Sequence, residues 1–148
     1  MSSRDFERMN WSAPNLMVVC VDARDGNDSR GRLYDCYHKE EQRFENEYQL
    51  IKMMECLMDD LDYPQSAVEL RVYCPKPVSA EKGQKPKKLQ EQRELLQYRG
   101  NLATFVIYVQ YRQNATWQGD IGWAERNTIC SFRSVLEMLK LMDNAQEK

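Results

Sequence analysis

Two separate stretches of the chain show the same order of apolar and polar positions. Residues 17–23 and 105–111 are apolar runs rich in β-branched and aromatic residues, which favour buried strands. A polar segment with the turn-forming residues Asn, Asp, Ser or Gly follows each run. A second strand is then expected at about 32–38 in the first stretch and about 120–125 in the second. Each stretch therefore predicts a β-hairpin.

A helix start follows each predicted hairpin. Asn46 and Ser134 each have a partner three residues later, Gln49 and Glu137, as in the capping box that closes the first turn of many helices. We therefore expect Asn46 and Ser134 to be helix N-caps. Apolar residues then recur at helical spacing, so each helix has an apolar side that can pack on a sheet. These residues are Tyr48, Ile51, Met54, Cys56 and Met58 in the first helix, and Val135, Leu136, Met138, Leu139, Leu141 and Met142 in the second.

The two stretches align without gaps at an offset of 88 residues, 17–54 against 105–142. The alignment contains seven identities, which are Val18/Val106, Val21/Val109, Arg24/Arg112, Gly31/Gly119, Phe44/Phe132, Lys52/Lys140 and Met54/Met142. Because strands, turn, cap and apolar stripe coincide as well, we interpret the pattern as a tandem ββα repeat. Phe44 and Phe132 are then expected to be buried just before each helix.

The segment between the repeats differs in composition. Residues 67–73 alternate apolar and charged positions like a half-buried strand, and 75–86 contain three prolines and a glycine, which predicts a loop. Residues 87–99 predict a short polar helix that ends before Gly100.

The predicted fold class is therefore α+β. We expect five strands in one mainly antiparallel sheet, with two helices packed on one face and the other face open to solvent or a partner. The chain forms one domain, 1–148, in which repeat one (about 15–62) and repeat two (about 101–145) flank the strand, basic loop and short helix of 66–99.

The second stretch also carries a family resemblance. The hairpin sequence Arg-Gln-Asn-Ala-Thr-Trp-Gln-Gly at 112–119 is followed by Phe-Arg-Ser-Val-Leu-Glu-Met-Leu-Lys-Leu at 132–141. This combination resembles a family of small uncharacterised bacterial proteins with an RQNATWQG-type hairpin and an FRSxLExLKL helix. The resemblance implies a cytosolic bacterial protein and no particular activity.

Composition and charge exclude several classes of protein. With 21 basic and 23 acidic residues the net charge is −2, so no overall charge favours nucleic acid. No apolar run is long enough for a membrane helix, and residues 1–10 lack the apolar core of a secretory signal, so we expect a cytoplasmic protein without membrane contact. Five cysteines without C-x-x-C spacing argue against a disulfide framework or a zinc site. We expect no metal and no cofactor.

Catalytic chemistry has little support in the sequence. The single histidine, His38, shares a face of the predicted strand with Cys36, which formally allows a thiolate–imidazolium pair. The same alternation is typical of any sheet face, however, and no third residue that would orient the imidazole is evident. We therefore expect no catalytic residue and a non-enzymatic protein.

The clearest functional signal is the composition of the second hairpin. Aromatic, arginine and amide side chains of this kind are enriched in binding hot spots, and aromatic rings also stack on bases. The candidate binding residues are Tyr111, Arg112, Gln113, Asn114, Trp117, Gln118 and Trp123. An equally good interpretation is that the two tryptophans complete a small core while the amides shape the turn.

The leading hypothesis is a protein-binding or self-associating module, whose partner is another protein or a second copy of the chain. The alternative hypothesis is a nucleotide or single-stranded nucleic-acid binder. In that case the second hairpin would act with the basic segment 75–100, which has seven basic and three acidic residues.

Overall fold

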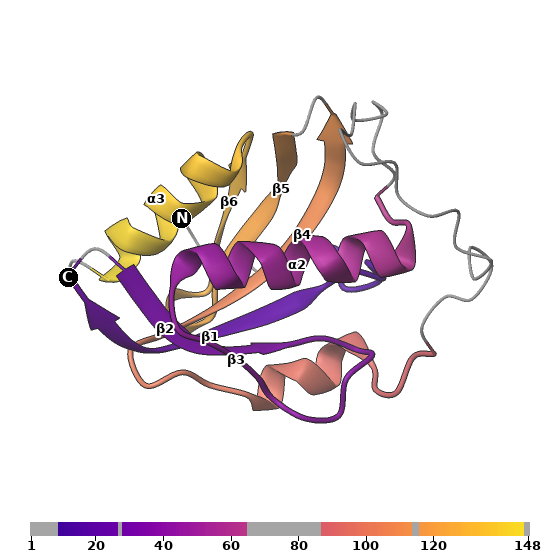
Figure 1. Cartoon of the computed structure of the whole chain (residues 1–148), viewed down its shortest axis with the longest axis horizontal. Coiled ribbons are helices and arrows are strands. Elements are labelled where there is room, and N and C mark those ends of the chain that lie inside the picture. Colours follow the sequence, from indigo (N-terminus) through magenta and orange to yellow (C-terminus); the bar gives the residue numbers. More distant parts are fainter. Residues whose placement is uncertain (1–8, 27, 65–86, 114–115, 147–148) are drawn as a thin grey trace, which may run out of the picture.

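The computed structural model describes residues 9–26, 28–64, 87–113 and 116–146 (Figure 1). It confirms the α+β class, with one six-stranded antiparallel sheet in the order β3-β2-β1-β4-β5-β6 and two main helices. The elements are β1 (Met17–Asp25), β2 (Asp28–Tyr34), β3 (Gln42–Phe44), α2 (Glu47–Leu61), the 3₁₀ helix η1 (Gln92–Gln97), β4 (Ala103–Gln113), β5 (Thr116–Trp123), the 3₁₀ helix η2 (Ala124–Arg126), β6 (Thr128–Phe132) and α3 (Val135–Gln146).

The hairpins differ from the prediction in their length and number of strands. β1 and β2 pair as far as Asp25 and Asp28, so most of the polar segment expected as a turn belongs to the ladder. Gly26, with φ of 67°, takes the left-handed conformation at this tight turn. The ladder extends through polar residues because it is built from backbone groups. Each half also has a third strand, β3 or β6, so the described residues form six strands where four were expected.

The segment between the halves is only partly described. The predicted strand at 67–73 and the loop at 75–86 lie outside the described residues. The predicted helix at 87–99 is present as the shorter 3₁₀ helix η1.

The strand register is closely matched between the two halves. Val18 lies opposite Val106 in the central β1–β4 pair. Each inner hairpin has an irregularity in the same place, between Val21 and Ala23 in β1 and between Val109 and Tyr111 in β4. At the outer strands Gly31 lies opposite Phe44, and Gly119 lies opposite Phe132.

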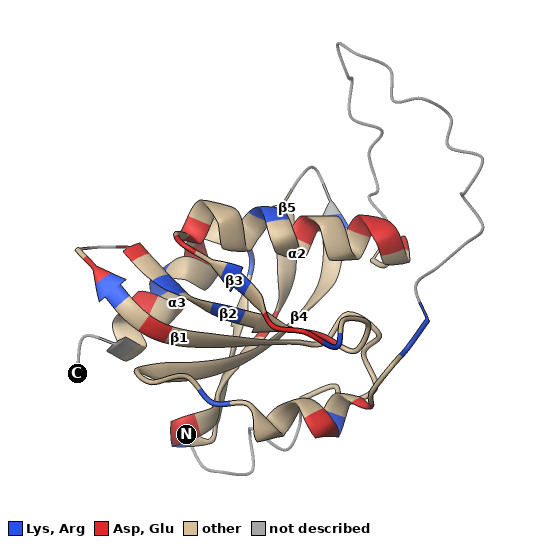
Figure 2. Cartoon of the chain, turned by 60° about the horizontal axis from the view of Figure 1, so that its bottom comes forward, with Lys and Arg blue, Asp and Glu red and all other residues tan. Residues whose placement is uncertain are grey.

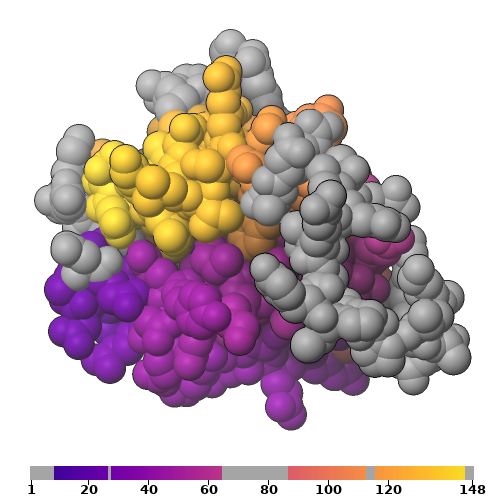
Figure 3. All heavy atoms as spheres, turned by 45° about the horizontal axis from the view of Figure 1, so that its top comes forward, coloured from indigo at the N-terminus to yellow at the C-terminus, as the bar shows by residue number. Residues whose placement is uncertain are grey.

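Both helices pack on the same face of the sheet, and in Figure 3 they form the adjoining magenta and yellow parts of its surface. Their apolar sides meet the side chains of the strands in one core cluster. Phe44 and Phe132 belong to this cluster and are each 1% exposed, as predicted.

The second face of the sheet is not open, in contrast to the prediction. The segment before β1 and the helix η1 cover its centre and form a second apolar core cluster with β1, β2 and β4. This cluster contains Met9, Ala13, Leu16, Val18, Cys20, Tyr34, Cys36, Leu95, Val106, Tyr108 and Ala124. Tyr34 and Tyr98 stack at its margin with ring centroids 3.7 Å apart. Of the helices in the described part of the chain, none is long and apolar enough to cross a membrane.

The N-caps of both main helices are those predicted from the sequence. The Asn46 side chain accepts a hydrogen bond from the Gln49 N–H at 2.8 Å, and the Ser134 hydroxyl accepts one from the Glu137 N–H at 3.0 Å. Each cap supplies a partner for an N–H group that the helix itself leaves unbonded.

Removal of a cap should lower stability moderately. We expect Ser134→Ala and Asn46→Ala each to reduce the free energy of unfolding by about 1 kcal/mol in a urea titration. Asn144→Ala, at an exposed position of α3, is the control and should cause no loss. A Ser134→Ala variant as stable as the parent would show that the cap is replaced by water.

Candidate functional site

The structure places the predicted binding residues of the second hairpin in different environments. Tyr111 is 49% exposed, while Gln118 and Trp123 are half-buried. Arg112 and Trp117 are only 7% and 5% exposed. Asn114 and the side chain of Gln113 lie outside the described residues. The hairpin therefore presents Tyr111 to solvent, whereas its arginine and first tryptophan face the protein.

Arg112 links β4 to the C-terminal end of α2 by hydrogen bonds. Its Nε donates to the Pro64 carbonyl at 2.6 Å, and its Nη1 donates to Asp59 Oδ1 at 2.8 Å. Arg24, 88 residues earlier, makes a similar contact in the opposite sense, because its Nη1 lies 3.1 Å from Asp143 Oδ1 on α3. Each arginine thus binds the helix of the other half of the sheet.

The two tryptophans take structural positions of different exposure. Trp117 belongs to the core on the helix face, which leaves no ring surface for a stacked base. The ring centroids of Trp123 and Phe105 lie 6.5 Å apart. The Arg126 guanidinium lies 5.3 Å from the centroid of the Trp123 ring. The Trp123 Nε1 is buried without a hydrogen-bond partner.

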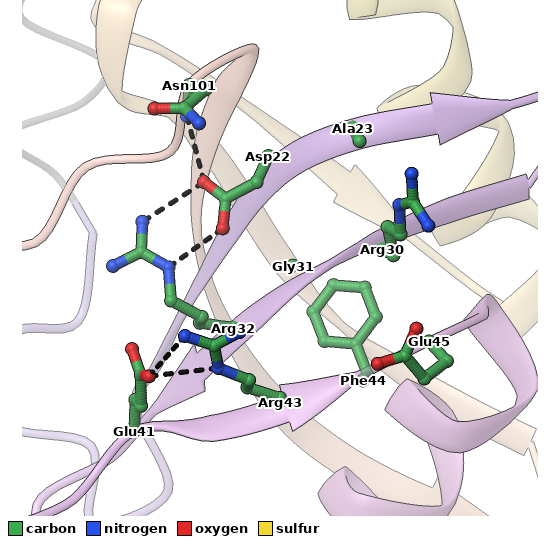
Figure 4. A pocket seen from close by; sticks show the side chains of 10 residues that line it. All are labelled: Asp22, Ala23, Arg30, Gly31, Arg32, Glu41, Arg43, Phe44, Glu45 and Asn101. Atoms are coloured by element: carbon green, nitrogen blue, oxygen red, sulfur yellow. Dashed lines mark hydrogen bonds and ion pairs between the residues drawn. The ribbon is translucent and has the colours of Figure 1, made fainter.

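A charged groove of about 560 Å³ lies at the β3 end of the sheet (Figure 4). Arg32 is fully used inside it: its Nε and Nη2 bind the two oxygens of Asp22 at 2.8 and 3.1 Å, and Nη2 also donates to the Arg99 carbonyl at 2.7 Å. Arg43 pairs with Glu41 at 2.9 Å. Figure 2 shows that positive and negative residues occur together along β2 and β3.

The ionisation of Asp22 follows from this pairing. Burial by itself would raise the pKa of the Asp22 carboxyl, but the hydrogen bonds from Arg32 and from the Asn101 N–H lower it below its ordinary value. The groove is therefore largely an internally neutralised network. Of the charged lining residues, Arg30 and Glu45 are those for which no ion pair is present within the described part of the chain.

The outer strand at the opposite end of the sheet, β6, contains no charged residue. β6 consists of Thr128, Ile129, Cys130, Ser131 and Phe132, and among the described strands none pairs with its outer edge. An apolar pocket of about 60 Å³ lies beside this strand, beneath α3. Its lining consists of Phe105, Ile121, Trp123, Thr128, Cys130, Leu141 and Ala145.

Cys36 and His38 do not share a strand face, in contrast to the expectation. β2 ends at Tyr34, so both residues lie in the loop that follows. Cys36 is fully buried, and burial raises the pKa of its thiol to about 11. The Cys36 thiol is therefore an inert part of the second core.

In comparisons with known proteins, no family model, no curated protein and no solved structure matches the chain. The family resemblance of residues 112–119 and 132–141 stays a prediction.

Proposed function

We propose that this protein is a self-associating binding module in which two copies pair antiparallel along β6. The pairing would join two six-stranded sheets into one continuous sheet across a twofold axis. The single observation that supports this proposal most strongly is the uncharged, unpaired outer edge of β6 within the described chain.

The chemistry of β6 favours pairing with another strand. An edge strand presents backbone N–H and C=O groups in a row, and proteins that stay monomeric usually protect such an edge with charges, proline or a very short strand. β6 has five residues, none of them charged and none of them proline. Thr, Ile and Phe are moreover among the residues that favour strands.

The β3 edge has the protection that β6 lacks. β3 has only three residues, Gln42–Phe44, and its central Arg43 pairs with Glu41 just before the strand. Figure 4 shows these charged side chains gathered at this end of the sheet. Since one edge is blocked, association through the other closes at two copies rather than continuing into a filament.

We also infer that the two halves arose by duplication of one βββα unit, a longer unit than the expected ββα. Support comes from the register, since the irregularities at Val21 and Val109 and the outer pairs Gly31–Phe44 and Gly119–Phe132 all correspond at the offset of 88 residues. On this view β3 and β6 are equivalent strands that have diverged, one toward a protected edge and one toward an open edge.

The proposed dimer has a defined register. A five-residue strand overlaps a second copy of itself completely when its central residue, Cys130, lies on the twofold axis. Directly opposite residues of antiparallel strands have Cα atoms about 4.5–5.5 Å apart, which is within the range that a disulfide bond can span. Cys130 should therefore cross-link to its own counterpart.

The oligomeric state tests the proposal. We expect size-exclusion chromatography with light scattering to give a dimer that dissociates on the order of micromolar concentration, because the interface is small. A mild oxidant should then produce a covalent dimer that Cys130→Ser abolishes and Cys56→Ser does not.

An exchange of edge residues supplies the matched variants. Ser131→Arg gives exposed Ser131 of β6 the residue that β3 has at the corresponding position, Arg43, and should weaken dimerisation at least about tenfold. Arg43→Ser is the control and should leave the dimer intact. A wild-type protein that stays monomeric at all concentrations, or a dimer insensitive to Ser131→Arg, would refute the proposal. Binding of a single-stranded oligonucleotide by the monomer would favour the alternative hypothesis instead.

A further inference from the structure

The loop between β2 and β3 holds a buried carboxylate, Asp35, that accepts several hydrogen bonds. Asp35 is fully buried. Its Oδ1 accepts hydrogen bonds from the N–H groups of Tyr37 and His38 at 2.8 and 3.0 Å, and its Oδ2 accepts one from Gln42 Nε2 at 2.9 Å. These bonds hold the carboxylate in one orientation.

The same carboxylate orients the imidazole of His38. His38 Nδ1 lies 3.0 Å from both oxygens of Asp35. A carboxylate can only accept from this nitrogen, so Nδ1 carries the proton of the neutral ring and Nε2 has a free lone pair. An asparagine at position 35 could accept the two backbone hydrogen bonds with its single side-chain oxygen. The carboxylate of Asp35 does more, because its negative charge stabilises the imidazolium that forms when His38 Nε2 takes up a proton.

His38 shares a cavity of about 190 Å³ with α2. From the helix, Lys52, Cys56 and Asp60 line this cavity at intervals of four residues, which places them on one stripe. Cys56 is exposed, unlike the buried thiols Cys20 and Cys36. The cavity therefore combines an accessible thiol with an oriented base.

We propose that Cys56 and His38, with Asp35 as the positioning residue, form a thiol-exchange site for a small disulfide. His38 Nε2 takes the proton of the Cys56 thiol, and the thiolate attacks one sulfur of the disulfide. The bond from Cys56 to that sulfur forms while the disulfide bond breaks. The departing thiolate takes the proton from Nε2, so the products are a mixed disulfide on Cys56 and one free small thiol.

The Cys56 thiol and the His38 ring line one cavity but share no hydrogen bond, and bonds between a nucleophile and its base are often long before a ligand binds. Among the described residues, no group of three or more His, Cys, Asp and Glu side chains is placed to hold a metal ion.

The test measures the reactivity of one cysteine. Cys74→Ser and Cys130→Ser together leave Cys56 and the two buried thiols, and dithiodipyridine serves as the small disulfide. We expect one thiol per folded chain to react, with Cys56 identified by peptide mass spectrometry. His38→Gln should slow the reaction at neutral pH at least about tenfold.

Two further variants separate the roles of the neighbouring groups. Asp35→Asn should slow the reaction as well and shift its pH profile, while Lys52→Met should have little effect. His38 is half exposed, so His38→Gln stays informative even if Asp35→Asn fails to fold. The proposal is overturned if Cys56 reacts no faster than glutathione, if His38→Gln leaves the rate unchanged, or if only Lys52→Met lowers it.

Discussion

Alanine at Gly31 or at Gly119 is expected to lower the free energy of unfolding by about 3 kcal/mol or more. A Cβ atom at Gly31 would lie 1.8 Å from the Cys20 carbonyl oxygen, and one at Gly119 would lie 2.1 Å from the Tyr108 carbonyl oxygen. Both obstacles are backbone atoms of the neighbouring strand at its irregularity, so no side-chain rotation relieves the overlap. The inner hairpin has to separate at this point.

Gly26→Ala is the matched control for these two substitutions. Gly26 has no atom within 4 Å of its Cβ position, but its φ of 67° is unfavourable for alanine. A cost of about 1 kcal/mol is therefore expected, from backbone strain alone. Urea titrations of the three variants should separate the two effects. If Gly31→Ala were no more costly than Gly26→Ala, the close approach of β1 and β2 would be wrong.

Arg112→Ala is expected to destabilise the protein by about 2–3 kcal/mol. The substitution leaves the Pro64 carbonyl without its donor and removes a side chain that is only 7% exposed. The ion pair itself contributes little of this loss, since the Asp59 side chain is 51% exposed. Most of the effect should come from the carbonyl contact and from lost packing.

Arg24→Ala is the comparison for Arg112→Ala. Within the described residues Arg24 forms one ion pair, with Asp143, and both side chains are partly exposed, so a loss of about 1 kcal/mol is expected. Arg112→Lys should retain little of the stability, because lysine lacks the planar guanidinium that bonds Pro64 and Asp59 together. Equal losses for Arg112→Ala and Arg24→Ala in thermal and urea unfolding would instead indicate that Arg112 is available at the surface, as the composition of its hairpin suggests.

The helix starts and inner hairpins could be predicted because their signals are local. A cap such as Asn46 accepts a hydrogen bond from an N–H three residues away. The strands β1 and β4 are recognisable from their own apolar, β-branched and aromatic residues. The outer strands were not predictable in this way. β3 has three residues, too few to show alternation, and it is a strand because Gly31 and Phe44 pair.

The environments of the candidate site residues were harder to predict because their partners are distant in the sequence. Arg112 is 53 residues from Asp59 and 48 from Pro64, so its composition alone suggested a surface contact. The residue types that form binding hot spots also make good buried anchors. Asp35, by contrast, lies only three residues before His38, so the Asp-x-x-His pattern after a predicted strand is a local signal for this pair.

The central strand pair sets the order in which the chain can fold. Val18 pairs with Val106, whereas every other strand pair joins neighbours in the sequence. Hairpins form in about 1–10 μs, but contacts between distant residues have to overcome the entropy of a long closed loop and form late. Until β1 meets β4, both are exposed, strongly apolar edges. The stage most prone to misassembly during synthesis is therefore the joining of the halves rather than the formation of either.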